Sequence, residues 1–165
     1  MIHAVSARTY RAWLGGLAGL ALVAAGCAPA RPTPASPARC DDHVDLAQTM
    51  PAEMRALGAT SAVGSGDTWY FAPASADWSS SVQPEGDGYQ LKIGMWIATP
   101  RPPQVTVREV SGGNAVGTTT FAPTTGGLPG PLPSTSHMPA PGCWEIVARG
   151  PTGSASARVR VGPAS

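Results

Sequence analysis

Apolar and polar residues alternate along several short segments in the second half of the chain, which is the pattern of half-buried β-strands. In the clearest segment, residues 89–97, the apolar side chains from Tyr89 to Ile97 face one way, while Gln90 and Lys92 face the other. Residues 68–72 predict a second strand and residues 104–110 a third.

A further strand is predicted at residues 115–121, because apolar and β-branched residues follow a run of turn residues there. The turn residues 111–114 are Ser, Gly, Gly and Asn, which favour a tight reversal of the chain. We therefore expect residues 104–110 and 115–121 to form a hairpin.

The end of the chain predicts the most regular hairpin, with strands at residues 143–149 and 154–161 joined by a turn at 150–153. Within the first strand, Trp144 and Ile146 are expected to pack inward and Glu145 to face outward. Several short strands separated by turn residues argue for an all-β fold, a single antiparallel β-sandwich.

Two regions fit the strand pattern less well. Residues 40–60 carry apolar side chains at roughly helical spacing, interrupted by Pro51, and predict one or two short helical turns. Residues 122–142 are rich in proline and show little periodicity, so they indicate a functional or mobile loop, or an error in the strand assignment. A short edge strand at residues 134–138 is the alternative, since edges tolerate proline.

The beginning of the chain has the pattern of a bacterial lipoprotein signal peptide. Arg8 and Arg11 precede an apolar run, residues 12–25, which is too short to cross a hydrocarbon layer that needs about 20 residues. Small residues then stand directly before Cys27. We expect residues 1–26 to be removed and Cys27 to carry lipid at the extracytoplasmic face of the cell membrane. The alternative is an ordinary secretory signal in which Cys27 is incidental.

Residues 27–39 contain four prolines among small residues and predict an extended Pro/Ala-rich tether, which leaves residues 40–165 for the folded domain. Removing residues 1–26 changes the formal net charge from +1 to −1, because Arg8 and Arg11 are lost. A chain without a basic patch gives no reason to expect nucleic-acid binding.

With Cys27 acylated, Cys40 and Cys143 are the cysteines that remain. An oxidising compartment favours a disulfide between them, which would join the start of the domain to its final hairpin. The alternative is a pair of buried free thiols.

The acidic segment 41–45, which also contains His43, invites a metal hypothesis through Asp41, Asp42, His43 and Asp45. Ligands so close in sequence need a loop of the EF-hand kind to converge on one ion, and no such pattern follows. We therefore expect a solvated acidic segment, with no metal and no cofactor.

Motifs for catalysis are absent from the sequence: it contains no nucleophile elbow, phosphate-binding glycine loop, HExxH or CxxC. His137 lies near Ser134 and Ser136, but a Ser/His pair needs a third group to orient the base. We expect a protein that is not an enzyme, with a hydrolase using His137 as an alternative.

Residues 141–149, Pro-Gly-Cys-Trp-Glu-Ile-Val-Ala-Arg, resemble the C-terminal strand of a family of poorly characterised bacterial secreted proteins and lipoproteins. The likeness extends more weakly upstream, to Trp69 and to residues 92–96 and 103–110. The resemblance implies an immunoglobulin-like sandwich in which Gly142, Trp144 and Glu145 form the core motif, and it supplies no catalytic residues. Ala155 and Ala157 depart from the pattern, since relatives hold bulkier apolar residues there.

These features together predict a lipid-anchored envelope protein that acts as a binding or assembly module for an envelope protein or a glycan. The alternative is a structural or accessory surface lipoprotein with no specific ligand. We expect a partner to meet the loops opposite the tether, and residues 122–142 above all. Trp78 and the aromatic run 69–71 would favour binding if they were exposed together, but we expect them in the core.

Overall fold

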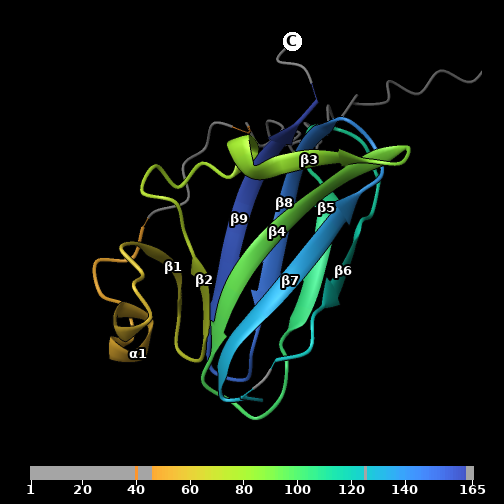
Figure 1. The fold of residues 1–165 in the computed structure, drawn as a ribbon. Coiled ribbons are helices and arrows are strands. Elements are labelled where there is room, and N and C mark those ends of the chain that lie inside the picture. The colour runs from red at the N-terminus through yellow and green to blue at the C-terminus, as the bar shows by residue number, and fades with distance from the viewer. Residues whose placement is uncertain (1–39, 41–45, 125, 163–165) are drawn as a thin grey trace, which may run out of the picture. The chain divides into compact units, whose positions relative to one another are not determined.

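The computed structural model describes residue 40, residues 46–124 and residues 126–162. These residues form two antiparallel β-sheets packed face to face, with one short helix beside them (Figure 1). The all-β sandwich predicted from the alternation is therefore confirmed. The predicted signal peptide, Cys27, the tether 27–39 and the acidic segment 41–45 lie outside the described residues.

Every pairing between strands of the described chain is antiparallel. The elements, in chain order, are α1 (Ala52–Ala56), β1 (Ala62–Ser65), β2 (Thr68–Phe71), a 3₁₀ turn (Ser79–Ser81), β3 (Val82–Glu85), β4 (Gly88–Ile97), β5 (Gln104–Glu109), β6 (Thr118–Phe121), β7 (Gly130–Met138), β8 (Gly142–Arg149) and β9 (Ser154–Val161).

The larger sheet has the strand order β1-β2-β4-β7-β6, and β3 also pairs with β4. Its centre is the long antiparallel pair β4–β7, which runs from Tyr89 opposite Met138 to Ile97 opposite Gly130. The smaller sheet has the order β5-β8-β9, with β8 in the middle.

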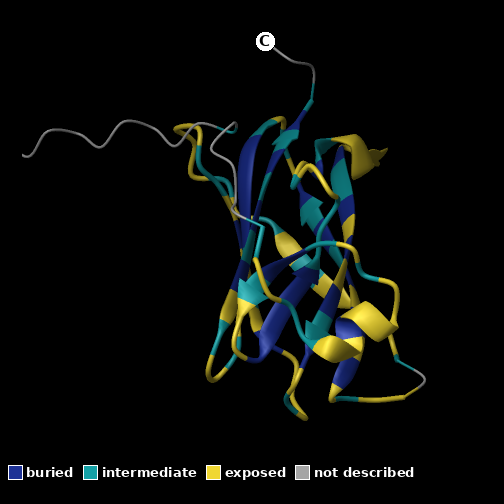
Figure 2. Cartoon of the chain, turned by 90° about the vertical axis from the view of Figure 1, so that its left-hand side faces the viewer, coloured by how far each residue is buried: buried dark blue, intermediate teal, exposed yellow. Residues whose placement is uncertain are grey.

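The core fills the space between the two sheets, as the buried faces of the strands show in Figure 2. Leu91, Ile93, Met95 and Ile97 of β4 are all buried, on the face that the alternation predicts. Trp144 of β8 is fully buried opposite them, and its indole N–H donates a hydrogen bond to the Ala140 carbonyl at 3.0 Å. The longest strand and the largest buried side chain therefore meet in one core.

A second, smaller apolar cluster covers the outer face of the large sheet. Met54 of α1 is fully buried against Trp69, with Trp96 partly buried beside it. Pro51 stands immediately before α1, where a missing N–H costs nothing, so it begins the helix instead of interrupting it.

The predicted hairpin of residues 104–110 and 115–121 is wrong, because β5 and β6 belong to different sheets. The chain starts a reversal, in which the Glu109 N–H bonds to the Ala115 carbonyl and the Gly117 N–H to the Val107 carbonyl. It then crosses to the large sheet. A Cβ on Gly117 would lie 2.2 Å from the His137 carbonyl oxygen, so this crossing needs glycine.

The loop predicted at 122–142 is wrong for residues 130–138, which form strand β7. The alternative strand at 134–138 is present, but it is longer than predicted and lies between β4 and β6 instead of at an edge. Pro131 and Pro133 are compatible with a central strand because of where their nitrogens point. The Ala122 N–H bonds to the Pro133 carbonyl, so the backbone of Pro133 faces the β6 side. Pro131 is two residues away, so its nitrogen points to the same side, past the end of β6. Neither proline therefore removes a hydrogen bond between β7 and β4.

Candidate functional site

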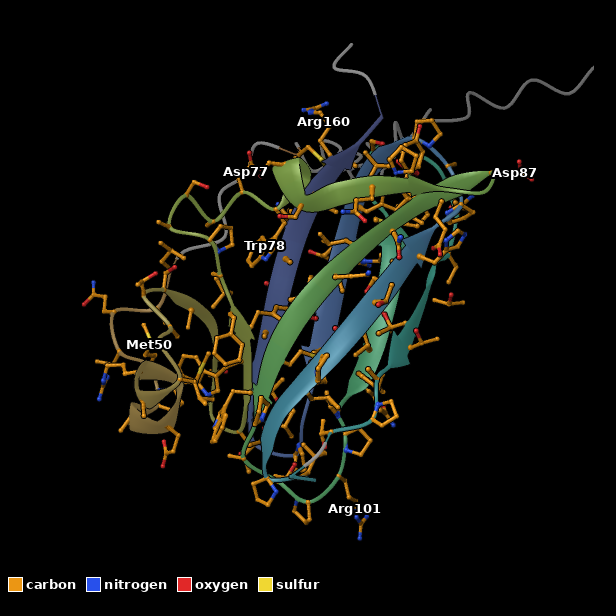
Figure 3. The ribbon with its side chains drawn as sticks, viewed as in Figure 1. Met50, Asp77, Trp78, Asp87, Arg101 and Arg160 are labelled. Carbon is orange, nitrogen blue, oxygen red and sulfur yellow. A yellow bond between two sulfur atoms is a disulfide. The ribbon has the colours of Figure 1, made fainter. Side chains whose placement is uncertain are left out.

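The two ends of the sandwich differ, and Figure 3 marks them with Asp87 at one end and Arg101 at the other. The disulfide end contains the Cys40–Cys143 bond, which is present as predicted, with its Cα atoms 5.3 Å apart. The loop end consists of the β1–β2 turn, the β4–β5 loop at residues 98–103, the described part of residues 122–129, and the β8–β9 turn.

His137 and its neighbouring serines point to opposite faces of β7, so the structure does not bring them together as a catalytic pair. The Ser134 hydroxyl donates to the Ile93 carbonyl at 2.8 Å inside the sandwich, and the Ser136 hydroxyl lies 2.9 Å from that of Thr119. The His137 imidazole is on the outer face of the sheet, 3.9 Å from the Glu85 carboxylate, and both groups are solvent-exposed.

Glu145 lies on the outer face of the small sheet, as the alternation of β8 predicts, and two arginines cover it. Arg108 of β5 donates from Nε at 2.9 Å, and Arg158 of β9 from Nη2 at 3.3 Å. Burial raises the pKa of Glu145, but the hydrogen bonds and charges of the arginines outweigh it and hold that pKa below its usual value. The carboxylate therefore stays ionised, and the two arginines balance its charge across the three strands. It is not suited to act as a general base.

Tyr70 and Trp78 lie in the core between the sheets, as predicted, whereas Trp69 packs with Met54 in the smaller cluster. Trp69, Tyr70 and Trp78 are each less than a tenth exposed. The rings of Tyr70 and Trp78 meet edge to face, with centroids 6.4 Å apart. Burial raises the pKa of the Tyr70 hydroxyl. These side chains form no exposed aromatic patch that would favour glycan binding.

At the loop end, a buried carboxylate joins two turns that are distant in sequence. Asp67, between β1 and β2, is 5% exposed and accepts hydrogen bonds from the Thr152 N–H at 3.1 Å and from the Thr68 hydroxyl at 3.0 Å. A Cβ on Gly150 would lie 2.3 Å from Asp67, and one on Gly153 would lie 1.9 Å from the Ser65 carbonyl oxygen. The two turns are therefore in direct contact.

Replacing Asp67 with asparagine is expected to cost about 1–3 kcal/mol, because an amide cannot accept all the hydrogen bonds that the carboxylate does. Burial raises the pKa of Asp67, but hydrogen bonds from Thr152 and Thr68 outweigh it, so that pKa is lowered overall. The stabilisation is thus fully present above the ordinary carboxyl pKa of about 4 and is lost as the pH falls through the lower pKa of the folded protein.

Urea unfolding of the wild type and Asp67→Asn, measured from pH 7 down to pH 2, tests this expectation. The difference in unfolding free energy between the two proteins should shrink in the most acidic samples. Asp87→Asn, at the exposed tip of the β3–β4 turn, is the control and should match the wild type throughout. A difference for Asp67→Asn that is the same at every pH would contradict a carboxylate-specific role.

The loop end also carries a surface hollow of about 330 Å³. Its lining residues are Pro123, Thr124, Gly126, Gly127, Pro131 and Pro133. The volume is at the lower end of the range for small-ligand sites, and no charged side chain lines it. The sequence predicted that residues 122–142 would meet a partner. The hollow itself arises because Pro131 and Pro133 belong to β7 and project from its outer face.

A second hollow of about 320 Å³ lies toward the disulfide end. Its lining residues are Ser79, Val82, Pro84, Tyr89, Arg160 and Gly162. Within residues 46–124 and 126–162 together with Cys40, no group of three or more His, Cys, Asp or Glu side chains is arranged to hold a metal. No helix in this described part is long and apolar enough to cross a membrane.

Protein-family models, curated proteins and solved structures were all compared with the chain, and none of them matches it.

Proposed function

We propose that this protein is a lipid-anchored module at the extracytoplasmic face of the bacterial membrane, and that it binds an envelope partner through its loop end. The observation that carries the proposal is the Cys40–Cys143 disulfide. Structural disulfides persist in oxidising compartments outside the cytoplasm. Cys40 also directly follows the predicted tether, so the bond holds the entering chain at the end opposite the loops.

The strand order supports the immunoglobulin-like assignment that the resemblance implies. Strands β3-β4-β7-β6 follow the order of the A-B-E-D sheet of constant-type immunoglobulin domains, and β5-β8-β9 follow that of the C-F-G sheet. Two features are particular to this chain. The β1–β2 hairpin extends the first sheet, and Cys143 bonds to the entering chain instead of to β4, the counterpart of strand B.

The loop end is the surface that this proposal favours for binding, because it carries an uncharged hollow and because two of its turns are joined through Asp67. Loops held on a rigid scaffold are where binding residues usually gather. A hydrolase using His137 with Ser134 or Ser136 is less well supported, since its imidazole and these two hydroxyls lie on opposite faces of β7. A purely structural lipoprotein is the alternative that experiment must separate.

The test compares proteins captured with the wild type, Gly126→Trp, Asp87→Trp and Cys27→Ser from native membranes after cross-linking. Gly126 has open space around its Cβ position, so tryptophan fits there and obstructs the hollow. We expect Gly126→Trp to lose the partner that the wild type captures. Asp87→Trp adds the same bulk at the disulfide end and should retain it. Cys27→Ser should leave the membrane fraction.

Each outcome separates one part of the proposal from the others. Retention of every partner by Gly126→Trp, with unchanged melting, would move the binding surface away from the hollow. A wild type that captures nothing specific would favour the structural alternative. A Cys27→Ser protein that stays in the membrane fraction would mean that lipid on this cysteine is not the anchor.

A further inference from the structure

Most sheet edges in the described chain are blocked by nearby groups. The Ser65 hydroxyl bridges the Ser154 N–H and carbonyl on the edge of β9, and the Ser79 hydroxyl accepts from the Arg160 N–H further along that edge. On the edge of β1, the Ala62 carbonyl accepts from the Ala47 N–H. Edge strand β3 carries Pro84. Such devices keep sheets from pairing with other chains.

The edge of β6 has no such device. The Ala122 N–H bonds to the Pro133 carbonyl, so the even-numbered residues of β6 direct their backbone groups to β7. The backbone groups of Thr119 and Phe121 therefore point away from the sheet. Within the described residues, no hydrogen bond reaches those groups of Thr119 or Phe121, and β5 bonds to this side only before β6 begins, at Gly117.

The segment of chain that contains this edge is uncharged and partly apolar. Residues 110–136 contain no Asp, Glu, Lys or Arg. Phe121 is 36% exposed and Val116, just before β6, is 72% exposed. Charged side chains are a common means of keeping an edge strand unpaired, and this segment lacks them.

We propose that β6 pairs antiparallel with β6 of a second copy of this chain, about a two-fold axis through Thr120. In this register, Thr119 faces Phe121 of the second copy, and both such pairs exchange their two backbone hydrogen bonds. Thr120 faces its own counterpart as a non-hydrogen-bonded pair, in which side chains approach most closely. The exposed Phe121 ring becomes covered.

The neighbouring registers satisfy fewer backbone groups. Shifting the axis to Thr119 would pair Phe121 with Gly117, whose N–H already bonds to the Val107 carbonyl. Shifting it to Phe121 would pair Thr119 with Pro123, which has no N–H. The free groups of β6 are thus self-complementary in one register, and a symmetric pair introduces no like charges. These features favour a second copy as the occupant of this edge.

The register is tested by single cysteines in the full chain, oxidised in whole cells and resolved on non-reducing gels. Cα atoms of a non-hydrogen-bonded pair lie about 4.5 Å apart, which suits a disulfide. We expect Thr120→Cys to form a covalent dimer. Thr118→Cys, which faces Ala122 of the second copy, should cross-link at least about tenfold less. Gln83→Cys, on the opposite edge of the sheet, should stay monomeric.

A charge exchange at Thr120 provides an independent measurement. This exposed side chain makes no hydrogen bond within the described chain, so Thr120→Lys and Thr120→Glu should melt like the wild type. Like charges directly opposite each other destabilise a pair of strands, so each variant alone should be monomeric in light scattering corrected for detergent. Mixing the two variants should restore the dimer.

A monomeric wild type, or equal cross-linking from all three cysteine variants, would overturn the proposal. Cross-linking of Thr120→Cys to a different protein, without a homodimer, would overturn it in favour of a foreign extended segment on the same edge. None of these results depends on Gly126 or on lipid at Cys27, so the proposed function is tested separately.

Discussion

Replacing Trp144 with alanine is expected to lower the unfolding free energy by about 3–5 kcal/mol, the usual cost of truncating a buried tryptophan. The side chain has no solvent exposure, and its indole N–H bonds to the Ala140 carbonyl, so both packing and a hydrogen bond are lost. Domains of this size are commonly stable by only about 5–15 kcal/mol. A large part of the native stability should therefore disappear.

Thermal unfolding followed by circular dichroism measures this loss, which corresponds to a fall in melting temperature of roughly 10–20 °C. Trp144→Phe is the matched control, because it keeps an aromatic ring in the core and removes the indole N–H. We expect its melting temperature to lie between those of the wild type and the alanine variant. An alanine variant that melts with the wild type would show that Trp144 does not support the core.

Removing the disulfide is expected to have an effect of similar size. Cys40 and Cys143 are 103 residues apart, and the chain-entropy model gives about 4–5 kcal/mol for a loop of that length. Cys143 is buried, so alanine is preferable to serine, which would bury an additional hydroxyl. Urea unfolding of the double variant Cys40→Ala/Cys143→Ala should show the lower midpoint.

Reductant supplies the control for this experiment. It should lower the midpoint of the wild type toward that of the double variant and leave the double variant unchanged. Each single variant should be about as unstable as the double one, because one bond can be lost only once. Alkylation of both cysteines in denatured wild type without reductant would contradict the bond itself.

Alternation of apolar and polar residues predicted the strands that have one buried face. It worked for β4 and for the final hairpin, because each strand exposes its other face to solvent or to the arginine–glutamate ladder. It failed for β7, where Pro131 and Pro133 occupy outward positions and gave the segment the composition of a loop. Strands β1 and β3 were not predicted, since four residues that include glycine or proline carry too little periodicity.

The connection between β5 and β6 marks the limit of local sequence patterns. Turn residues 111–114 do begin a reversal, but the choice between a hairpin and a crossing depends on close contacts around Gly117 with Val107 and His137. These contacts exist only once both sheets have assembled. The pattern of residues 104–121 therefore predicted both strands, with the second starting three residues too early, and paired them wrongly.

The candidate sites were predictable to different degrees. Counting cysteines predicted the disulfide, because few thiols were left to choose between. The separation of His137 from Ser134 and Ser136 also follows from strand parity, once residues 130–138 are recognised as one strand. The hollow at the loop end was not predictable, since residues 123–127 and the prolines of β7 form it together only in the folded domain.

The covalent ring closed by Cys40 and Cys143 has a consequence for proteolysis of the folded protein. The exposed loops at residues 98–103 and 122–124 lie inside the ring. A single protease cut in either loop opens the ring but leaves both pieces joined through the disulfide. The cleaved protein would stay attached to whatever segment precedes Cys40, and a reducing gel would display it as two fragments. Separation of the two pieces requires a second event, reduction of that bond.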